Sequence, residues 1–348
     1  MAENRLDFKK EQQKNSEKHE SRIRVFLGGL LAYFCSLMLS LENLAGLLEE
    51  HRAAAAAKVR EFSIGDRFFA FNSEPAIMGV VNLSPDSWYR ESVCLTAERA
   101  VQRGKILSAQ GAAMIDVGAE STLAQARRVD PAGQQGKLLP VVKELAAAHL
   151  IVSVETYQKE VARASLEAGA KVINLTGRED SAEIFALAAE HSAGVIICYV
   201  QGRNVREAGD FDLEEVIPAM EDYFLRQTEL AAKEGLKKIW IDPGLGFYYR
   251  NLQDSAVRVR HQMMTFLQTF RLRAMGFPVC HALPHAFEYF GEEVRCAEPF
   301  FVVLAALGKT DLFRTHEVPR IKAVLETLKI FQPPPPCRTG KRPPPRKE

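Results

Sequence analysis

The sequence predicts an α/β protein built as a (β/α)8 TIM barrel, with an N-terminal helical extension before the barrel and a disordered Pro-rich basic tail after it. Short β-rich segments alternate with longer helical segments eight times between residues 76 and 328, close to the ~250 residues typical of a closed barrel. Several helical segments end at a glycine that opens the next strand, as at Gly111, Gly169 and Gly235. A doubly wound open sheet is the competing fold, but its GxGxxG fingerprint is absent after the first strand.

The expected strands are short runs rich in apolar and β-branched residues, at 76–81, 113–117, 150–154, 171–175, 194–200, 238–241, 277–283 and 310–315. Helical patterns are expected between them, among others at 97–110, 158–168, 182–191, 213–234 and 318–328. Because a helix separates each strand from the next, the strands are expected to run parallel and to be joined by right-handed crossovers.

The first of these strands indicates where the functional site lies. Its apolar run fits a strand that is buried on both faces, and it stops at the polar Asn82. Pro85 then breaks the pattern, because proline removes a hydrogen-bond donor and disfavours helix in the residue before it. Asn82 is therefore expected at the mouth of a buried strand, beneath a polar loop.

Three regions are expected along the chain: an N-terminal extension at 1–60, the barrel at 61–331 and a tail at 332–348. An uncharged run at 25–41, about 17 residues long, falls short of the ~20 residues that a membrane helix needs. We expect this run to form a buried or partner-facing helix, with a membrane anchor as the alternative. The tail combines proline runs with basic residues, which is typical of a disordered end.

The composition is that of a globular protein without a strongly charged partner. The 348 residues are 47% hydrophobic and 26% charged, and a net charge of +1 gives no reason to expect nucleic acid. The six cysteines contain no CxxC pair, so neither a disulfide framework nor a structural zinc site is expected. Scattered thiols suit a reducing compartment, and a cytoplasmic location is therefore expected.

Polar residues follow the expected strands at the point where each strand ends. In a barrel the site lies at this carboxyl end of the strands. The residues in question are Asn82, Asp116, Glu120, Ser121, Thr122, Glu155, Asn174, Gln201, Asp242, Arg314 and His316. Each of them could simply terminate a strand, but together they predict a ring of polar groups around a single mouth, which core packing does not require.

The order of these residue types suggests the kind of ligand. Carboxylates and amides on the middle strands suit a flat heterocycle, whose edge offers adjacent N–H donors and carbonyl acceptors. Arg314 and His316 are two residues apart on one strand, so they point to the same side and can meet a phosphate or diphosphate. Asn82, on the neighbouring strand of a closed ring, could hold Mg²⁺ through its amide oxygen.

Residues 76 to about 328 resemble dihydropteroate synthase, the pterin-binding enzyme of folate biosynthesis. The resemblance rests on six segments that occur in the family's order: MGVVNLSPDS at 78–87, GAAMIDVGAEST at 111–122, SVET at 153–156, GAKVIN at 169–174, DPGLGF at 242–247 and RTHEV at 314–318. It implies a Mg²⁺-dependent transferase that joins 6-hydroxymethyl-dihydropterin diphosphate to p-aminobenzoate and releases diphosphate. It also allows a homodimer formed through barrel helices.

The resemblance implies a role for each matched residue. The pterin would be bound by Glu155, Asn174, Asp242 and His285. Thr122 would lie in the loop that closes over p-aminobenzoate. Diphosphate would be bound by Asn82, Arg314 and His316, with magnesium beside Asn82, and Arg314 and His316 would be catalytic because they stabilise the departing anion.

The chain also departs from the family pattern at several of these loops. The arginine and proline of the second loop are Leu123 and Ala124, and the third-strand aspartate is the longer Glu155. The seventh-strand segment with the family's lysine and serine is LPHA at 283–286, so His285 is the nearest replacement for that lysine. A metal site made by His281 and His285 is not expected, because Pro284 prevents the helix that would bring them together.

These departures leave alternatives open. The first is a pterin-binding barrel without synthase activity, which would act as a binder or regulator or use a different second substrate. A methyl transfer from a folate is disfavoured by the NLSPDS segment at 82–87. A scaffold role driven by the N-terminal segment is the weakest alternative.

Overall fold

The computed structural model describes residues 39–87, 89–122, 126–207, 216–247, 249, 252 and 254–331. The chain divides into two compact units, Met1–Arg52 and Ala53–Glu348. The first contains α2 (Leu41–Glu50), which begins where the Ser40 side chain accepts a hydrogen bond from the Asn43 N–H. The helix α3 (Arg52–Ala55) follows it. Most of the run at 25–41 and all of the tail at 332–348 lie outside the described residues.

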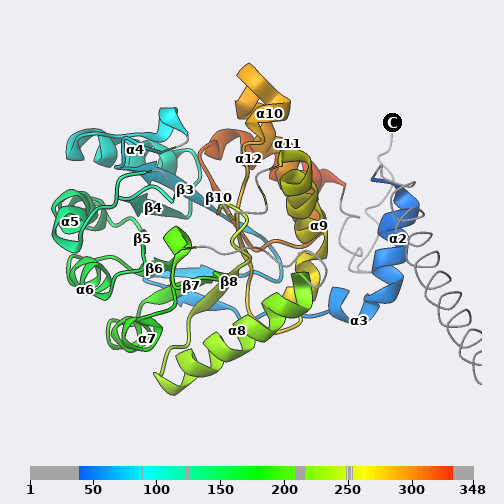
Figure 1. The fold of residues 1–348 in the computed structure, drawn as a ribbon, viewed down its shortest axis with the longest axis horizontal. Helices are drawn as coiled ribbons and strands as arrows, with labels where there is room; N and C mark the ends of the chain where they lie inside the picture. Colours follow the sequence, from blue (N-terminus) through cyan, green and yellow to red (C-terminus); the bar gives the residue numbers. More distant parts are fainter. Residues whose placement is uncertain are drawn as a thin grey trace, which may run out of the picture. The chain divides into compact units, whose positions relative to one another are not determined.

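The second unit contains eight parallel strands that form a nearly closed barrel, and this confirms the predicted fold (Figure 1). The strands are β3 (Ala76–Asn82), β4 (Met114–Gly118), β5 (Val152–Thr156), β6 (Val172–Leu175), β7 (Gly194–Cys198), β8 (Ile239–Asp242), β9 (Cys280–Ala282) and β10 (Leu312–Thr315). They pair in the order β8-β7-β6-β5-β4-β3-β10-β9, and a parallel bridge between Ile241 and Val279 joins the two ends of this order.

Helices surround the strands (Figure 1). They are α4 (Ala97–Ala109), α5 (Pro131–Ala147), α6 (Lys159–Glu167), α7 (Ser181–Glu190), α8 (Val216–Lys233), α9 (Ser255–Arg273), the short α10 (Phe287–Phe290), α11 (Ala297–Leu307) and α12 (Val318–Ile330). Gly111, Gly169 and Gly235 follow α4, α6 and α8 with positive φ angles of 116°, 111° and 80°, which confirms their predicted role in ending these helices. No helix of the described residues is both long and apolar enough to cross a membrane.

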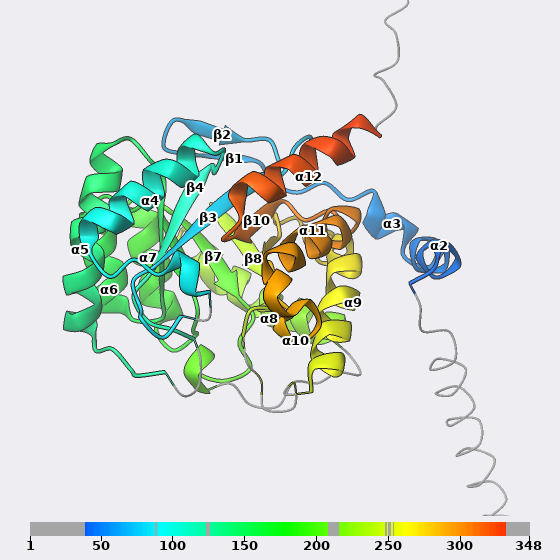
Figure 2. The same ribbon diagram turned by 90° about the horizontal axis from the view of Figure 1, so that it is seen from above.

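A hairpin that the sequence analysis did not predict covers the amino-terminal end of the barrel. The strands β1 (Phe62–Ile64) and β2 (Arg67–Phe69) pair antiparallel. Phe62 and Phe69 pack edge-on against the fully buried Trp240, at ring-centroid distances of 4.6 and 6.0 Å. The same cluster includes the first residues of several strands, so it fills the interior of the barrel at its amino-terminal end. Figure 2 shows this hairpin at one end of the barrel and α10 at the other. In barrels of this kind the site lies at the carboxyl end of the strands.

Candidate active site

A cavity of about 150 Å³ lies at the carboxyl end of the barrel. The eight residues that the sequence analysis assigned to substrate, diphosphate or metal all line it: Asn82, Thr122, Glu155, Asn174, Asp242, His285, Arg314 and His316. Asp116 is fully buried and does not line the cavity, and Gln201 hydrogen-bonds to the Tyr199 hydroxyl instead. The structure therefore brings the predicted residues to one opening, while their roles toward a ligand stay predictions.

A hydrogen-bonded network centred on Asp116 forms the floor of the cavity. The Asp116 carboxylate accepts hydrogen bonds from the Ser153 hydroxyl at 2.6 Å, from the Asn174 amide at 3.1 Å and from Nε of Arg314 at 2.7 Å. Arg314 also forms an ion pair with Glu155. The guanidinium thus lies between two carboxylates, and the four strands β4, β5, β6 and β10 are tied together beneath the cavity.

Two carboxyl groups of this cavity titrate near neutral pH. Burial raises the pKa of Glu155 to about 7, although the adjacent Arg314 opposes this rise. Burial also raises the pKa of Asp242 to about 6, while the Gly244 N–H, which donates to Asp242 Oδ1 at 2.8 Å, lowers it. Carboxyl groups in this range accept hydrogen bonds from a heterocyclic N–H once they are ionised.

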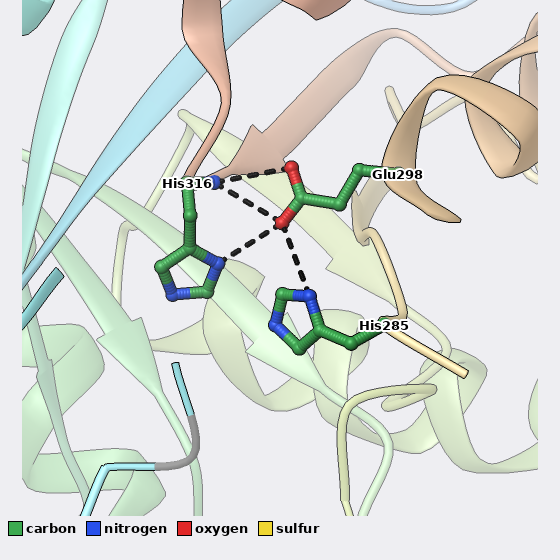
Figure 3. A group of neighbouring side chains, drawn as sticks. All are labelled: His285, Glu298 and His316. Atoms are coloured by element: carbon green, nitrogen blue, oxygen red, sulfur yellow. Dashed lines mark hydrogen bonds and ion pairs between the residues drawn. The ribbon is translucent and has the colours of Figure 1, made fainter. Parts of the chain in front are cut away.

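The cavity lining also includes two histidines, which lie around one buried glutamate (Figure 3). Nδ1 of His316 lies 3.0 Å from Oε1 of Glu298, and Nδ1 of His285 lies 3.6 Å from the same oxygen. The Tyr89 ring packs against both imidazoles, at centroid distances of 4.9 Å to His285 and 4.7 Å to His316. Burial lowers the pKa of His285 to about 4 and that of His316 to about 3, so both rings are neutral near pH 7 and each carries a single N–H.

Glu298 was not among the predicted site residues, although the sequence contains a signal for it. It is the second residue of α11, and it is the single charged residue in the helix AEPFFVVLAAL. A charged side chain at the start of so apolar a helix needs a buried partner. Spacing alone could not identify that partner, because His285 and His316 come from two different loops.

Asn82 lies in the cavity wall at the end of β3. Its amide nitrogen donates to the Ser92 hydroxyl at 2.6 Å and lies 3.4 Å from Nε2 of His316. Its amide oxygen accepts no hydrogen bond from any of the described residues. This oxygen is therefore available to a ligand or a cation.

The loop that contains Thr122 is fastened by a residue that sequence reasoning missed. Arg206, in the 3-10 helix Val205–Glu207, forms a buried ion pair with Glu120 at 3.5 Å and donates to the Ser121 carbonyl at 2.7 Å. Glu120 also accepts hydrogen bonds from Gln134 at 2.9 Å and from the Tyr157 hydroxyl at 3.1 Å. The substituted positions 123 and 124 of this loop lie outside the described residues.

Comparison with known proteins gives consistent matches over the barrel. Residues 78–283 match the profile of the family described as pterin binding enzyme. A dihydropteroate synthase of Streptococcus pyogenes serotype M6 is 33% identical over 216 residues, which cover 61% of this chain and 75% of the relative. Another from Streptococcus pyogenes is 32% identical over 273 residues, covering 75% of this chain and 97% of the relative. The solved structure of Xanthomonas albilineans dihydropteroate synthase with 4-aminobenzoic acid is 26% identical, with a TM-score of 0.67, and the match covers 80% of this chain and 100% of that one.

Proposed function

The chain belongs to the dihydropteroate synthase family of pterin-binding enzymes, and we propose from this membership that it joins 6-hydroxymethyl-dihydropterin diphosphate to p-aminobenzoate with release of diphosphate. The amine nitrogen attacks the pterin methylene carbon, the carbon–oxygen bond to diphosphate breaks, and the amine gives up a proton. The observation that carries this proposal is the network of Asp116, Glu155, Asn174 and Arg314, which connects four strands beneath the cavity.

The pterin ring is proposed to bind on the side of Glu155, Asn174 and Asp242. Ionised Asp242 and Glu155 accept hydrogen bonds from ring N–H groups, and Arg314 holds Glu155 in place through their ion pair. Asn174 is oriented by Asp116 on one side and by the Cys198 thiol, which donates to its amide oxygen at 3.3 Å, on the other. His285 lies at the rim of the same cavity, where it closes one edge of the ring site.

The diphosphate is proposed to bind on the side of Asn82, Arg314 and His316, which lie on or next to the adjacent strands β3 and β10. A magnesium ion is proposed here, because the amide oxygen of Asn82 accepts no hydrogen bond from the described residues and Mg²⁺ takes few protein ligands. When bound, such an ion neutralises charge on the diphosphate. Arg314 and His316 are proposed to stabilise the departing anion, Arg314 through its guanidinium charge, and positioning of the two substrates supplies the rest.

Thr122 lies in the loop that follows β4 and lines the cavity, and it is proposed to contact p-aminobenzoate. We further propose that the protein works in the cytoplasm on small molecules rather than on nucleic acid. The four cysteines in the described residues are free thiols, which suits a reducing compartment, and the net charge is +1. A homodimer stays a prediction from the family resemblance.

The proposal is tested with the full-length protein by calorimetry and by product formation. Dihydropterin diphosphate is titrated with and without Mg²⁺, p-aminobenzoate is then added, and dihydropteroate is measured. We expect binding and product, and we expect D242N to weaken pterin binding by about 10- to 150-fold through loss of a charged acceptor. D222N, on the exposed face of α8, is the matched control. Binding without product identifies a pterin-binding barrel that is not a synthase, and no binding contradicts both readings.

A further inference from the structure

We propose that His285, Glu298 and His316 form a binding site for a divalent transition-metal ion of the zinc class, separate from the magnesium proposed beside Asn82. In the described part of the chain, these three side chains are the group whose ligand atoms converge, all within 4.8 Å of one another. The proposal concerns metal binding by this chain and does not depend on which reaction the cavity supports.

The geometry is close to that of a metal-bound set. Two imidazole nitrogens and a carboxylate oxygen bound at ~2.0–2.2 Å in a tetrahedral site are separated by about 3.4 Å from one another. Here Oε1 of Glu298 lies 3.0 Å from Nδ1 of His316 and 3.6 Å from Nδ1 of His285. Figure 3 shows both rings turning this nitrogen toward the same carboxylate oxygen. The three ligand atoms together span no more than 4.8 Å, so an ion among them requires the side chains to draw closer to one another.

The carboxylate is oriented by groups behind it. Glu298 accepts hydrogen bonds from the Thr315 hydroxyl, from the His316 N–H at 3.2 Å and from the Glu317 N–H at 3.3 Å. Contacts of this kind hold a metal ligand in its binding orientation. Tyr89 covers the two imidazoles, and its hydroxyl donates to Glu317, so the rings are also held in place.

Two features of the site are incomplete without a cation. Nδ1 of His285 is buried and makes no hydrogen bond within the described part of the chain. The Glu298 side chain is 1% exposed, and among the described residues it has no lysine or arginine partner. The nearby Arg295 is paired with Glu317, and Arg314 is paired with Asp116 and Glu155. A divalent ion would supply a compensating charge to this buried carboxyl group, whose pKa burial raises.

The choice of metal follows from the donor atoms. Imidazole nitrogens favour zinc-class ions over Mg²⁺, and two histidines with one carboxylate leave coordination positions open. His285 and His316 line the cavity, so an ion held by them would lie beside it. His281, which the sequence analysis considered as a partner of His285, lies in the core and contacts the Thr269 hydroxyl at 2.8 Å. The partners of His285 are therefore Glu298 and His316, which the sequence could not place beside it.

The test is metal binding by the full-length protein. The chain is stripped with EDTA, desalted and titrated with Zn²⁺ in competition with a chromophoric chelator, and Co²⁺ is added in parallel to record visible absorption of four- or five-coordinate cobalt. We expect one tight ion per chain, with an affinity that excess Mg²⁺ does not change. Because loss of an outer-shell contact already costs 10- to 100-fold, E298Q and H285A are each expected to weaken Zn²⁺ binding by about 100-fold or more.

The matched control is H149N, which removes an exposed imidazole elsewhere in the barrel at a position of φ 60° that asparagine tolerates. It should bind Zn²⁺ as the wild type does. If E298Q does not fold, H285A, whose side chain lies on a rim loop, still provides the comparison. A wild-type chain that does not compete with the chelator, or variants that bind as tightly as the wild type, would overturn the proposal. Because the readout is metal binding, failure of the synthase assay leaves it unaffected.

Discussion

Arg314 lies between two carboxylates at the floor of the cavity, and its role in stability follows from that position. Asp116 is fully buried and its partners are Arg314, Asn174 and Ser153. We expect R314Q to lower the free energy of unfolding by ~3–5 kcal/mol, because it leaves a buried charge without its counter-ion. Urea denaturation measures this. R314K, which keeps the charge, should lose less, whereas R226Q, which breaks an exposed pair with Asp222, should change little. Equal effects of R314Q and R226Q would contradict the network.

Binding of the pterin is expected to depend on pH through Asp242 and Glu155. Burial raises their pKa values to about 6 and about 7. A ring N–H needs an ionised acceptor, so affinity should rise as pH increases from about 5 to about 8 and then level off. Calorimetry across this range measures the effect, and D242N should remove the lower part of the rise. An affinity that falls with increasing pH would show that the ring binds the protonated carboxyl groups.

The raised pKa of Asp242 makes the stability of the folded protein depend on pH in the opposite direction from ligand affinity. The pKa of Asp242 is higher in the folded chain than its ordinary value of 3.8, so the folded state binds the proton more tightly. This contribution to stability is fully present below the ordinary pKa and is lost as pH rises through about 6. D242N should therefore weaken the fall in stability of the ligand-free protein between about pH 4 and pH 7. Binding and folding thus respond to this carboxyl group with opposite signs.

At the scale of elements, close packing beneath the barrel limits what β7 tolerates. A Cβ atom on Gly194 would lie 2.8 Å from the Trp240 ring and 3.0 Å from Ile64. We expect G194A to lower the free energy of unfolding by about 1–3 kcal/mol through overpacking. Gly136 is exposed within α5, and a Cβ atom added there would meet open space. G136A should therefore raise the free energy of unfolding by about 0.5–1 kcal/mol. Thermal denaturation of both variants tests the pair, and stabilisation by G194A would contradict the packing.

Much of this arrangement of elements could be predicted, because a buried parallel strand and an amphipathic helix leave different periodic patterns. The strand expected at 277–283 is only Cys280–Ala282 in the structure; next to it, Val279 forms a single parallel bridge to Ile241, and its N–H donates to the Asp311 carboxylate at 2.8 Å. The hairpin of β1 and β2 was missed, because strands of three residues are too short to show a period. The position of this hairpin depends on contacts between residues far apart in sequence, such as Phe62 and Trp240.

The candidate site was predictable where it consists of strand ends, because the barrel brings these to one opening. Glu298 and Tyr89 could not be found in this way. Glu298 lies in the first turn of α11 and Tyr89 lies in a loop, and both contact the two histidines. Such contacts depend on how the loops fold back, which the spacing of residues along the chain does not reveal.

For the whole molecule, the division into two units predicts that the barrel is sufficient for binding. Every residue of the cavity belongs to the unit Ala53–Glu348. A fragment that begins at Ala53 should fold cooperatively and bind dihydropterin diphosphate with the affinity of the full chain, which denaturation and calorimetry can compare directly. A fragment that folds but binds more weakly would show that residues 1–52 contribute to the site.

The aromatic cluster around Trp240 has a consequence for how this chain can diverge. Large apolar rings fill the amino-terminal end of the barrel, while the cavity is lined by side chains at the other end. A mutation in a rim loop therefore does not touch the residues of this aromatic cluster. Selection can alter the surroundings of His285 over many generations, and even recruit a new ion there, while the scaffold below stays the same.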